Sequence, residues 1–265
     1  MFSLVKASNG VQFLRSDFIA AKHGFATRIG GVSTHPHTAS LNLAFGRGDE
    51  DETVIENLRL FADAVKIPAE SIISRPQIHS ATVITVSESM GGEGYFVPSD
   101  EGCDGYVTGR PGIALGVKTA DCVPILMEDS AAGVIGAVHA GWRGTASGIA
   151  AECVRKMCAL GAAPANIRAA IGPAIHFCCY EVGEDFLESV AALVGNDTAS
   201  RFIRLSGGRL HADIVGLNVD FLTGAGISPA NIDRSDFCTC CHPELFYSHR
   251  FSGGLRGTML SVISL

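Results

Sequence analysis

The sequence predicts a mixed α/β fold of the α+β type, organised as one domain over residues 1–265. The chain has 265 residues, 47% of them hydrophobic, and no Pro- or Ser-rich linker or change in composition divides it. Some segments have helical periodicity, whereas a larger number of short segments are rich in β-branched residues. Several of these short segments follow one another directly. That order favours a mixed, partly antiparallel sheet over a regular alternation of strands and helices.

The predicted helices have apolar residues three and four positions apart. They cover 51–67, 145–161, 181–195 and 211–226. In the first, Val54, Leu58 and Phe61 share one face, and in the second Cys153 lies on the apolar face before Gly161, the expected C-cap. The predicted strands are 81–87, 112–117, 123–127, 134–139, 167–172 and 258–263.

Charge and hydropathy exclude two classes of partner. A net charge of −7 and a pI near 5.7 argue against nucleic acid as the main partner, because neutralising phosphates requires a basic face. The first residues do not read as a signal peptide, and no apolar stretch reaches the length of a membrane span. We therefore expect a cytoplasmic protein that binds no membrane.

The nine cysteines are expected to be reduced thiols or metal ligands. Their odd number also argues against a complete set of disulfides. Each cysteine must therefore be judged by its neighbours.

One cysteine and one histidine are brought together by a predicted hairpin. The segments VPILMED and GVIGAVH flank SAAG, so that paired residue numbers sum to about 261 or 262. Cys122 and His139 sum to 261, which places them opposite or nearly opposite, with Cβ atoms ~5 Å apart, and lets them share one metal ion. On spacing alone, a half-buried thiol beside a hydrogen-bonded histidine explains the pair equally well.

The residues that flank this pair favour a functional site. Asp121 precedes the cysteine, and the segment AGWRG after the histidine supplies glycines, an aromatic plane and a permanent cation. A catalytic zinc usually has three protein ligands. His79, in polar surroundings just before a predicted strand, is the best third ligand, and His176 and His249 are its competitors.

Several motifs follow one another along the chain. In order, these motifs are QIHSATV, DGYVTGRPGIALGVKTADCVPIL, GAVHAGWRGTASGI, IGPAI with YEVG, and FCT with FYSHR. Their order resembles that of the YfiH or laccase-domain family. FATRIGGVS and SLNLAFGRGDE extend the resemblance over nearly the whole chain. It implies a single domain of layered mixed β-sheets flanked by helices. It also implies a zinc-dependent purine nucleoside phosphorylase that takes a nucleoside and phosphate, phosphorolyses methylthioadenosine and deaminates adenosine. Older descriptions of the family name copper-dependent polyphenol oxidases.

The resemblance also assigns roles to residues of this chain. The implied metal ligands are His79, Cys122 and His139, and the implied substrate or phosphate contacts are Arg28, Asn42 and Arg143. Arg143 is the expected catalytic cation, and Asp121 is the expected proton-transfer residue. Asp121 can equally serve only as a hydrogen-bond partner beside the ligand.

The C-terminal segment departs from the family's usual pattern, SYR followed by TGR. This chain has SHRFSGGLRGTML, so Arg250 and Arg256 are alternatives for the last arginine contact.

Three other functions compete with a nucleoside enzyme. A multicopper oxidase needs repeated H-x-H pairs, and this chain has one, at His35 and His37, although copper can enter a site of two histidines and one cysteine. A cysteine hydrolase would use Cys122 as nucleophile and His139 as base, which leaves His79 and the arginines without a role. A non-enzymatic zinc protein would close the site with a fourth protein ligand.

A further group of cysteines lies outside these motifs. Cys238 and Cys241 form one C-x-x-C, with Cys240 between them, and Cys178 and Cys179 lie far away in the sequence. A second zinc is conceivable, but no clearly spaced second pair exists. We expect reduced thiols packed in the core.

Overall fold

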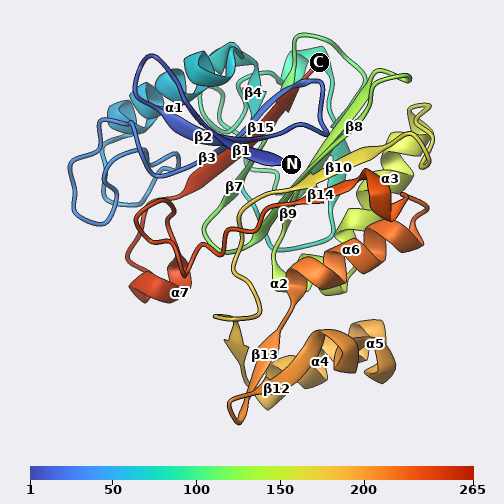
Figure 1. The fold of residues 1–265 in the computed structure, drawn as a ribbon. Helices are drawn as coiled ribbons and strands as arrows, with labels where there is room; N and C mark the ends of the chain where they lie inside the picture. Colours follow the sequence, from blue (N-terminus) through green and yellow to red (C-terminus); the bar gives the residue numbers. More distant parts are fainter.

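The computed structural model describes residues 1–265 and has two six-stranded sheets packed face to face between helices (Figure 1). Helix α1 (Asp51–Val65) covers the outer face of the first sheet. Helices α3 (Ile149–Ala159) and α6 (Ile214–Gly224) lie on the outer side of the second sheet. This layered arrangement confirms the predicted mixed α/β class. The assignment of residues 1–265 to one domain stays a prediction.

The first sheet has the strand order β1-β2-β3-β15-β7-β4. Its strands are β1 (Phe2–Lys6), β2 (Gln12–Ser16), β3 (Lys22–Ala26), β4 (Ile72–Ile73), β7 (Ala114–Thr119) and β15 (Met259–Ser264). All neighbours are antiparallel except β4 and β7. The C-terminal strand β15 therefore lies in the interior of this sheet, between β3 and β7.

The second sheet has the strand order β14-β10-β8-β9-β6-β5. Its strands are β5 (Val83–Thr85), β6 (Gly105–Thr108), β8 (Val123–Asp129), β9 (Val134–Ala140), β10 (Arg168–Ile171) and β14 (Ile232–Arg234). The four inner strands are antiparallel, and each edge strand is parallel to its neighbour. The predicted mixed, partly antiparallel pairing is confirmed.

Strand alternation in the second sheet decides which side chains face the first sheet. Leu126 and Ala137 point into the core between the sheets, and Met127 and Val138 point toward the helices on the other face. His139 follows Ala137 by two positions, so its side chain lies on the face turned toward the first sheet.

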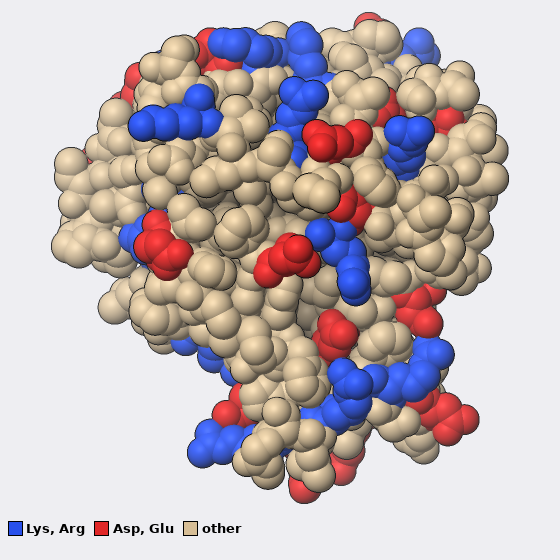
Figure 2. All heavy atoms as spheres, in the orientation of Figure 1, with Lys and Arg blue, Asp and Glu red and all other residues tan.

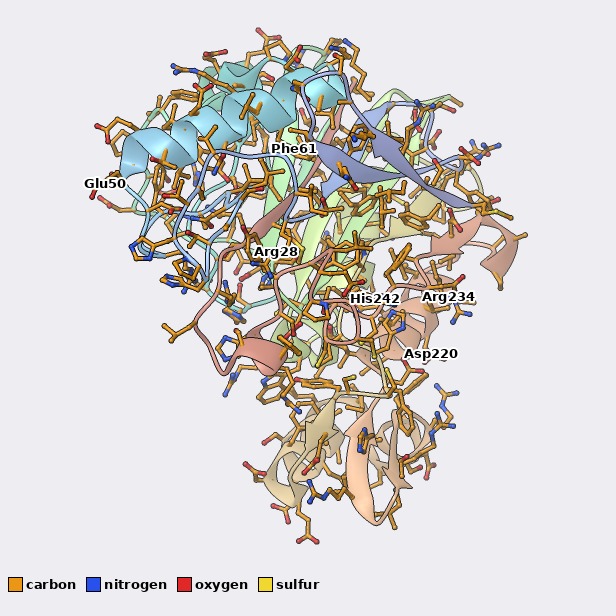
Figure 3. The ribbon with its side chains drawn as sticks, turned by 60° about the vertical axis from the view of Figure 1, so that its left-hand side comes forward. Arg28, Glu50, Phe61, Asp220, Arg234 and His242 are labelled. Carbon is orange, nitrogen blue, oxygen red and sulfur yellow. The ribbon has the colours of Figure 1, made fainter.

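Two predicted helices differ from the structure at their ends. Figure 3 shows Phe61 on the side of α1 that faces the strands and Glu50 at its start; α1 ends at Val65, before Lys66 with φ 60°. The segment predicted as one helix over 145–161 is divided between the end of a short helix α2 (Trp142–Ala146) and α3, because Gly148 with φ 75° interrupts the helix. None of the helices is both long enough and apolar enough to span a membrane.

A small lobe projects from the two-sheet body and is joined to it by a narrow neck (Figures 1 and 2). It contains the three-stranded sheet β11-β13-β12 and two helices. Its elements are β11 (Glu181–Val182), α4 (Glu184–Val194), α5 (Asn196–Phe202), β12 (Ile203–Ser206) and β13 (Arg209–Ala212). The sequence predicted its main helix but not its strands. Helix α7 (His249–Ser252) lies on the main body.

Candidate metal centre and its cavities

His79, Cys122 and His139 come together at one end of the second sheet. Their ligand atoms all lie within 4.8 Å of one another, and the two imidazole rings are nearly perpendicular, with centroids 4.9 Å apart. His139 is buried, Cys122 is half-buried and His79 is exposed, so the group opens on the side of His79. The competing ligands His176 and His249 are not part of this group.

The predicted hairpin is confirmed, but its predicted register is wrong. Pro124 pairs with His139 and Val123 with Ala140, so that paired numbers sum to 263 rather than 261 or 262. In the structure His139 therefore lies opposite Pro124, two residues beyond Cys122. Because a shift of two residues preserves the side-chain face, Cys122 remains a diagonal neighbour of His139 on that face.

Asp104 fixes the orientation of two of these residues, and the sequence analysis did not find it. Its Oδ1 accepts hydrogen bonds from His139 Nδ1 (2.9 Å) and from the backbone N–H of His79 (3.0 Å). Its Oδ2 accepts hydrogen bonds from the backbone N–H (2.7 Å) and the hydroxyl (2.8 Å) of Ser80. With Nδ1 engaged, His139 presents Nε2 to an incoming group. The available signal was the Asp at the start of the motif DGYVTGRPGIALGVKTADCVPIL.

Without a bound metal ion, Cys122 and His139 form an ion pair between a thiolate and an imidazolium. Burial raises the pKa of Cys122, but the charge and hydrogen bond of His139 outweigh burial and lower it to about 6. Burial lowers the pKa of His139, but the Cys122 thiolate and Asp104 raise it to about 9. A thiolate is the form that binds metal and also the form that attacks carbon. The two imidazoles and the thiolate therefore fit a divalent metal ion.

The backbone at this group leaves little space for an additional side-chain atom. A Cβ on Gly141 would lie 3.0 Å from the His79 ring and 3.4 Å from Cys122 Sγ. His79 and Asp121 have φ values of 56° and 95°, a region that non-glycine residues seldom adopt. Such conformations persist only where surrounding contacts hold them, and they concentrate at functional sites.

Two cavities meet at this group: all three ligands line the first, and His79 and Cys122 also line the second. The first, of about 670 Å³, we call the aromatic cavity, and its aromatic lining residues are Phe45, Tyr95 and Phe96. The second, of about 500 Å³, we call the arginine cavity, and its arginines are Arg47, Arg143, Arg250 and Arg256. His79, Cys122, Arg47 and Arg256 line both cavities. A small molecule at the ligand group can therefore reach an aromatic wall and a cationic wall together.

Two cations in the cavities were missed by the sequence analysis. Arg47 is exposed and lines both cavities, and its side chain makes no hydrogen bond or ion pair within the chain. Lys118 is in the aromatic cavity, where its Nζ donates to the Ser74 carbonyl (3.0 Å) and lies 5.1 Å from the centre of the Tyr95 ring. Burial lowers the pKa of Lys118 to about 8. FGRGD, next to the motif SLNL, contains Arg47, but no periodicity indicates either residue.

The two expected catalytic residues both line the arginine cavity. The Arg143 guanidinium lies 4.2 Å from the centre of the Trp142 ring and has no hydrogen-bond acceptor within the chain. Both carboxylate oxygens of Asp121 are occupied: Oδ1 accepts from the Thr239 hydroxyl (2.6 Å) and Oδ2 from the backbone N–H of Arg250 (2.7 Å). Arg143 is thus free to bind an anion. Asp121 instead connects its own segment to those of Thr239 and Arg250 through hydrogen bonds.

The structure does not bring the other two expected contacts to the ligands. Arg28 donates to the carbonyls of Ala39 and Pro243 and stacks on Tyr247. Asn42 is fully buried. Its side-chain NH₂ donates hydrogen bonds to the Ala44 carbonyl and the Asp49 carboxylate, and its Oδ1 accepts hydrogen bonds from the N–H groups of Ala44 and Thr258. Neither residue lines the aromatic or the arginine cavity. Their roles as substrate contacts stay predictions. Of the C-terminal alternatives, Arg250 and Arg256 both line the arginine cavity.

Layered α/β architecture and a His–Cys–His group at the junction of two cavities define the class: an enzyme that acts on small molecules. The chain belongs to the family described as multi-copper polyphenol oxidoreductase laccase, which matches residues 22–265. This match confirms the resemblance to the YfiH or laccase-domain family.

Similar proteins carry the names of nucleoside enzymes. A purine nucleoside phosphorylase of Deinococcus radiodurans is 38% identical over 256 residues, which cover 97% of this chain and 94% of that protein. A protein from an unknown prokaryotic organism, named adenosine deaminase RL5, is 34% identical over 92% of this chain and 95% of its own length. The crystal structure of the Bacillus licheniformis hypothetical protein YfiH superposes with a TM-score of 0.90 at 31% identity, covering 99% of this chain and 98% of that chain.

Proposed function

We propose that this protein is a zinc-dependent purine nucleoside phosphorylase that also deaminates adenosine. The observation that carries the proposal is the position of His79, Cys122 and His139 at the junction of the aromatic and arginine cavities. Phosphorolysis breaks the bond between the sugar C1′ and the base nitrogen and forms a bond from C1′ to a phosphate oxygen. It therefore requires a place for a planar base beside a place for an anion.

The aromatic cavity suits the purine. Phe45 and Tyr95 pack with ring centroids 5.7 Å apart, and Phe96 belongs to the same wall. Aromatic faces bind a planar base by stacking. Gln77 also lines this cavity, but its amide is engaged with the backbone of Lys118, so it helps to fix the wall.

The arginine cavity suits phosphate. Arg47 and Arg143 have no acceptor within the chain, and the Nε–H of Arg256 is buried without a partner. Guanidinium groups bind phosphate oxygens through paired, charge-assisted hydrogen bonds. These side chains would hold the anion beneath the sugar carbon and stabilise negative charge as the reaction proceeds.

The ligand group itself would hold the metal, with His79 and His139 as nitrogen ligands and the Cys122 thiolate as sulfur ligand. When bound, zinc with an open position lowers the pKa of water and orients anionic oxygens. Asp104 keeps the His139 proton on Nδ1, away from the metal side. We assign Asp121 a positioning role, since both of its oxygens already accept hydrogen bonds.

The proposal is tested by incubating the purified protein with adenosine, inosine or methylthioadenosine, with and without phosphate, and separating products by chromatography. We expect base and sugar 1-phosphate only when phosphate is present, and inosine from adenosine in either buffer. Release of free ribose at the same rate without phosphate would instead indicate a hydrolase. Metal analysis of the same preparation, together with the Cys122→Ala protein, tests the ligand set: full zinc retention at this site in that variant contradicts it.

A cysteine hydrolase is the second candidate, because Asp104, His139 and Cys122 also have the arrangement of an acid, a base and a nucleophile. In that enzyme His79 would have no role and metal would inhibit. Activity toward thioester or ester substrates that survives chelation and the His79→Ala substitution would favour it.

The family's description as an oxidoreductase makes copper the alternative metal. Two imidazoles and a thiolate are also a copper ligand set. Phenol oxidation that rises in proportion to copper loading, in a protein without phosphorolysis, would favour the oxidase.

A further inference from the structure

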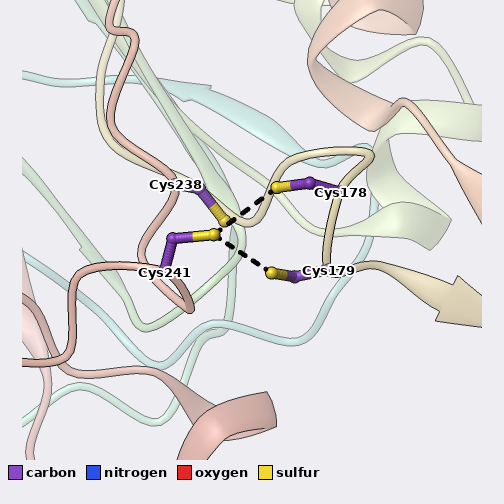
Figure 4. A group of neighbouring side chains, drawn as sticks. All are labelled: Cys178, Cys179, Cys238 and Cys241. Carbon is purple, nitrogen blue, oxygen red and sulfur yellow. Dashed lines mark hydrogen bonds between the residues drawn. The ribbon is translucent and has the colours of Figure 1, made fainter.

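A second group of metal-ligand side chains lies outside the catalytic site. The sulfur atoms of Cys178, Cys179, Cys238 and Cys241 all lie within 4.8 Å of one another (Figure 4). Cys241 Sγ is 3.6 Å from Cys178 Sγ and 3.3 Å from Cys179 Sγ. These separations exceed the ~2.05 Å of a disulfide. Sulfur atoms bound tetrahedrally at ~2.3 Å from one zinc ion lie roughly 3.8 Å apart.

The four cysteines come from two segments that the fold already holds together. Ala174 and Cys238 form an isolated parallel bridge, and the Thr239 N–H donates to the Ala174 carbonyl (2.9 Å). The thiols are thus brought together by backbone pairing and not by chance contact of flexible side chains. The expectation of thiols packed in the core is wrong for this group, because Cys178 and Cys241 are exposed.

Backbone donors surround one of the sulfur atoms. The His176 N–H donates to Cys238 Sγ (3.4 Å). The backbone N–H groups of Cys240 and Cys241 are also turned toward this sulfur atom. N–H groups turned toward a cysteine sulfur stabilise a thiolate and are compatible with a C-x-x-C metal-binding turn.

We propose that Cys178, Cys179, Cys238 and Cys241 bind a second zinc ion, in a closed structural site with four sulfur ligands. Zinc favours thiolate ligands in tetrahedral geometry. Binding forms four Zn–S bonds, and the thiol protons that remain on the cysteines are released to solvent. No oxidant or reductant takes part.

The position of this site indicates what the metal would stabilise. Only Tyr180 separates Cys178 and Cys179 from β11, where the chain enters the projecting lobe, and Cys238 and Cys241 follow β14 of the second sheet. The second zinc would therefore tie the neck of the lobe to the body. Arg250 of the arginine cavity donates to the carbonyls of Cys179 (3.3 Å) and Glu181 (2.8 Å), so the same metal would steady one cationic wall of the catalytic site.

Metal counting in the parent protein and in cysteine variants tests the proposal. Protein purified in reducing, chelator-free buffer should contain two zinc equivalents per chain, and the Cys178→Ser/Cys241→Ser protein should contain one. Cys240→Ser is the matched control: it alters the same CTCC run outside the four-sulfur group and should retain both equivalents. A parent protein with one equivalent that is lost in Cys122→Ala and unchanged in the double serine variant would overturn the second site. Iron in place of zinc would overturn the choice of ion.

Cobalt isolates this site from the catalytic one. In a Cys122→Ala/His139→Ala background, Co²⁺ should give the intense visible bands and thiolate charge-transfer absorption of a tetrahedral four-sulfur complex. The signal is independent of any nucleoside activity, so failure of the proposed function leaves it intact. Absence of these bands in folded protein with four free thiols contradicts the inference.

The unmodified protein provides a further measurement if the serine variants do not fold. Although Cys178 and Cys241 are exposed, both should resist alkylation until a strong chelator is added, whereas the partly exposed Cys158 should react at the same rate before and after. Rapid alkylation of Cys178 and Cys241 without chelator, or a disulfide between them in reducing buffer, argues against bound metal.

Discussion

Asp104 lies directly across the extended β6–β9 ladder from His139, and its Oδ1 is 2.9 Å from His139 Nδ1. The His139 N–H also donates to the Asp104 carbonyl (2.7 Å), so backbone and side chain hold the same pair. One buried carboxylate thus sets the tautomer of one proposed ligand and the backbone position of another.

We expect Asp104→Asn to weaken zinc binding at the catalytic site by roughly 10- to 100-fold, the usual effect of removing a carboxylate behind a metal-binding histidine. Asparagine carries no negative charge, and its side chain has one oxygen instead of two to accept hydrogen bonds. Competition with a chromophoric chelator measures the affinity. Asp17→Asn, at an exposed aspartate, is the control, and equal affinities of the two variants would contradict the orienting role.

Gly141→Ala should reduce metal occupancy while the fold remains intact. Gly141 has φ −67° and ψ 166°, which alanine adopts readily, so the effect comes from the new Cβ 3.0 Å from His79. Occupancy is measured by metal analysis, and thermal unfolding checks the fold. Gly224→Ala, where an added Cβ meets nothing within 4 Å, should retain full occupancy.

Arg143→Ala should leave zinc bound and slow phosphorolysis by about 30- to 1000-fold, which corresponds to roughly 2 to 4 kcal/mol of transition-state stabilisation. Arg143→Lys should recover only part, since an ammonium lacks the planar pair of donors. Deamination uses water rather than phosphate and should suffer less. Equal losses in both reactions, measured as kcat/KM, would mean that Arg143 contacts the nucleoside instead.

Lys118 should make stability depend on pH in a defined window. Burial lowers its pKa from 10.5 to about 8, so between these values the unfolded chain binds more protons than the folded chain, and the free energy of unfolding rises with pH. Relative to Lys118→Met, the parent protein should gain roughly 2 to 3 kcal/mol between pH 8 and 10.5. Urea unfolding at several pH values measures this difference. Lys66→Met, at an exposed lysine, should show no such window, and parallel curves for parent and Lys118→Met would contradict the buried charge.

The sequence alone predicted the parts of the fold that have strong local patterns. Strands β7, β8, β9, β10 and β15 and helices α1, α3, α4 and α6 all lie near their predicted ranges. It did not predict β1, β2 and β3, whose short segments lack a clear alternation. Of these only β3 pairs with β15, far away in the chain, and β1 and β2 join the sheet through β3.

Sequence reasoning indicated only those candidate site residues whose side-chain type and spacing along the chain both suggest metal binding. The hairpin suggested Cys122 and His139, the polar surroundings of His79 favoured it as the third ligand over His176 and His249, and the family resemblance implied the same three residues. Asp104 and Lys118 reach the site through strand pairing, which no local pattern reveals. The four cysteines illustrate the same limit, because the closeness of Cys178 to Cys241, 63 residues apart, depends on the bridge between Ala174 and Cys238.

Strand β15 is the last strand in sequence order, yet it lies between β3 and β7. Until the ribosome has released residues 259–264, β1, β2 and β3 have no connection to the rest of their sheet, and β3 and β7 both expose unpaired edges. Completion of this sheet must therefore wait until residues 259–264 have emerged. During synthesis the nascent chain carries two open edges that can pair with another nascent chain, and truncation before Met259 would make that exposure permanent.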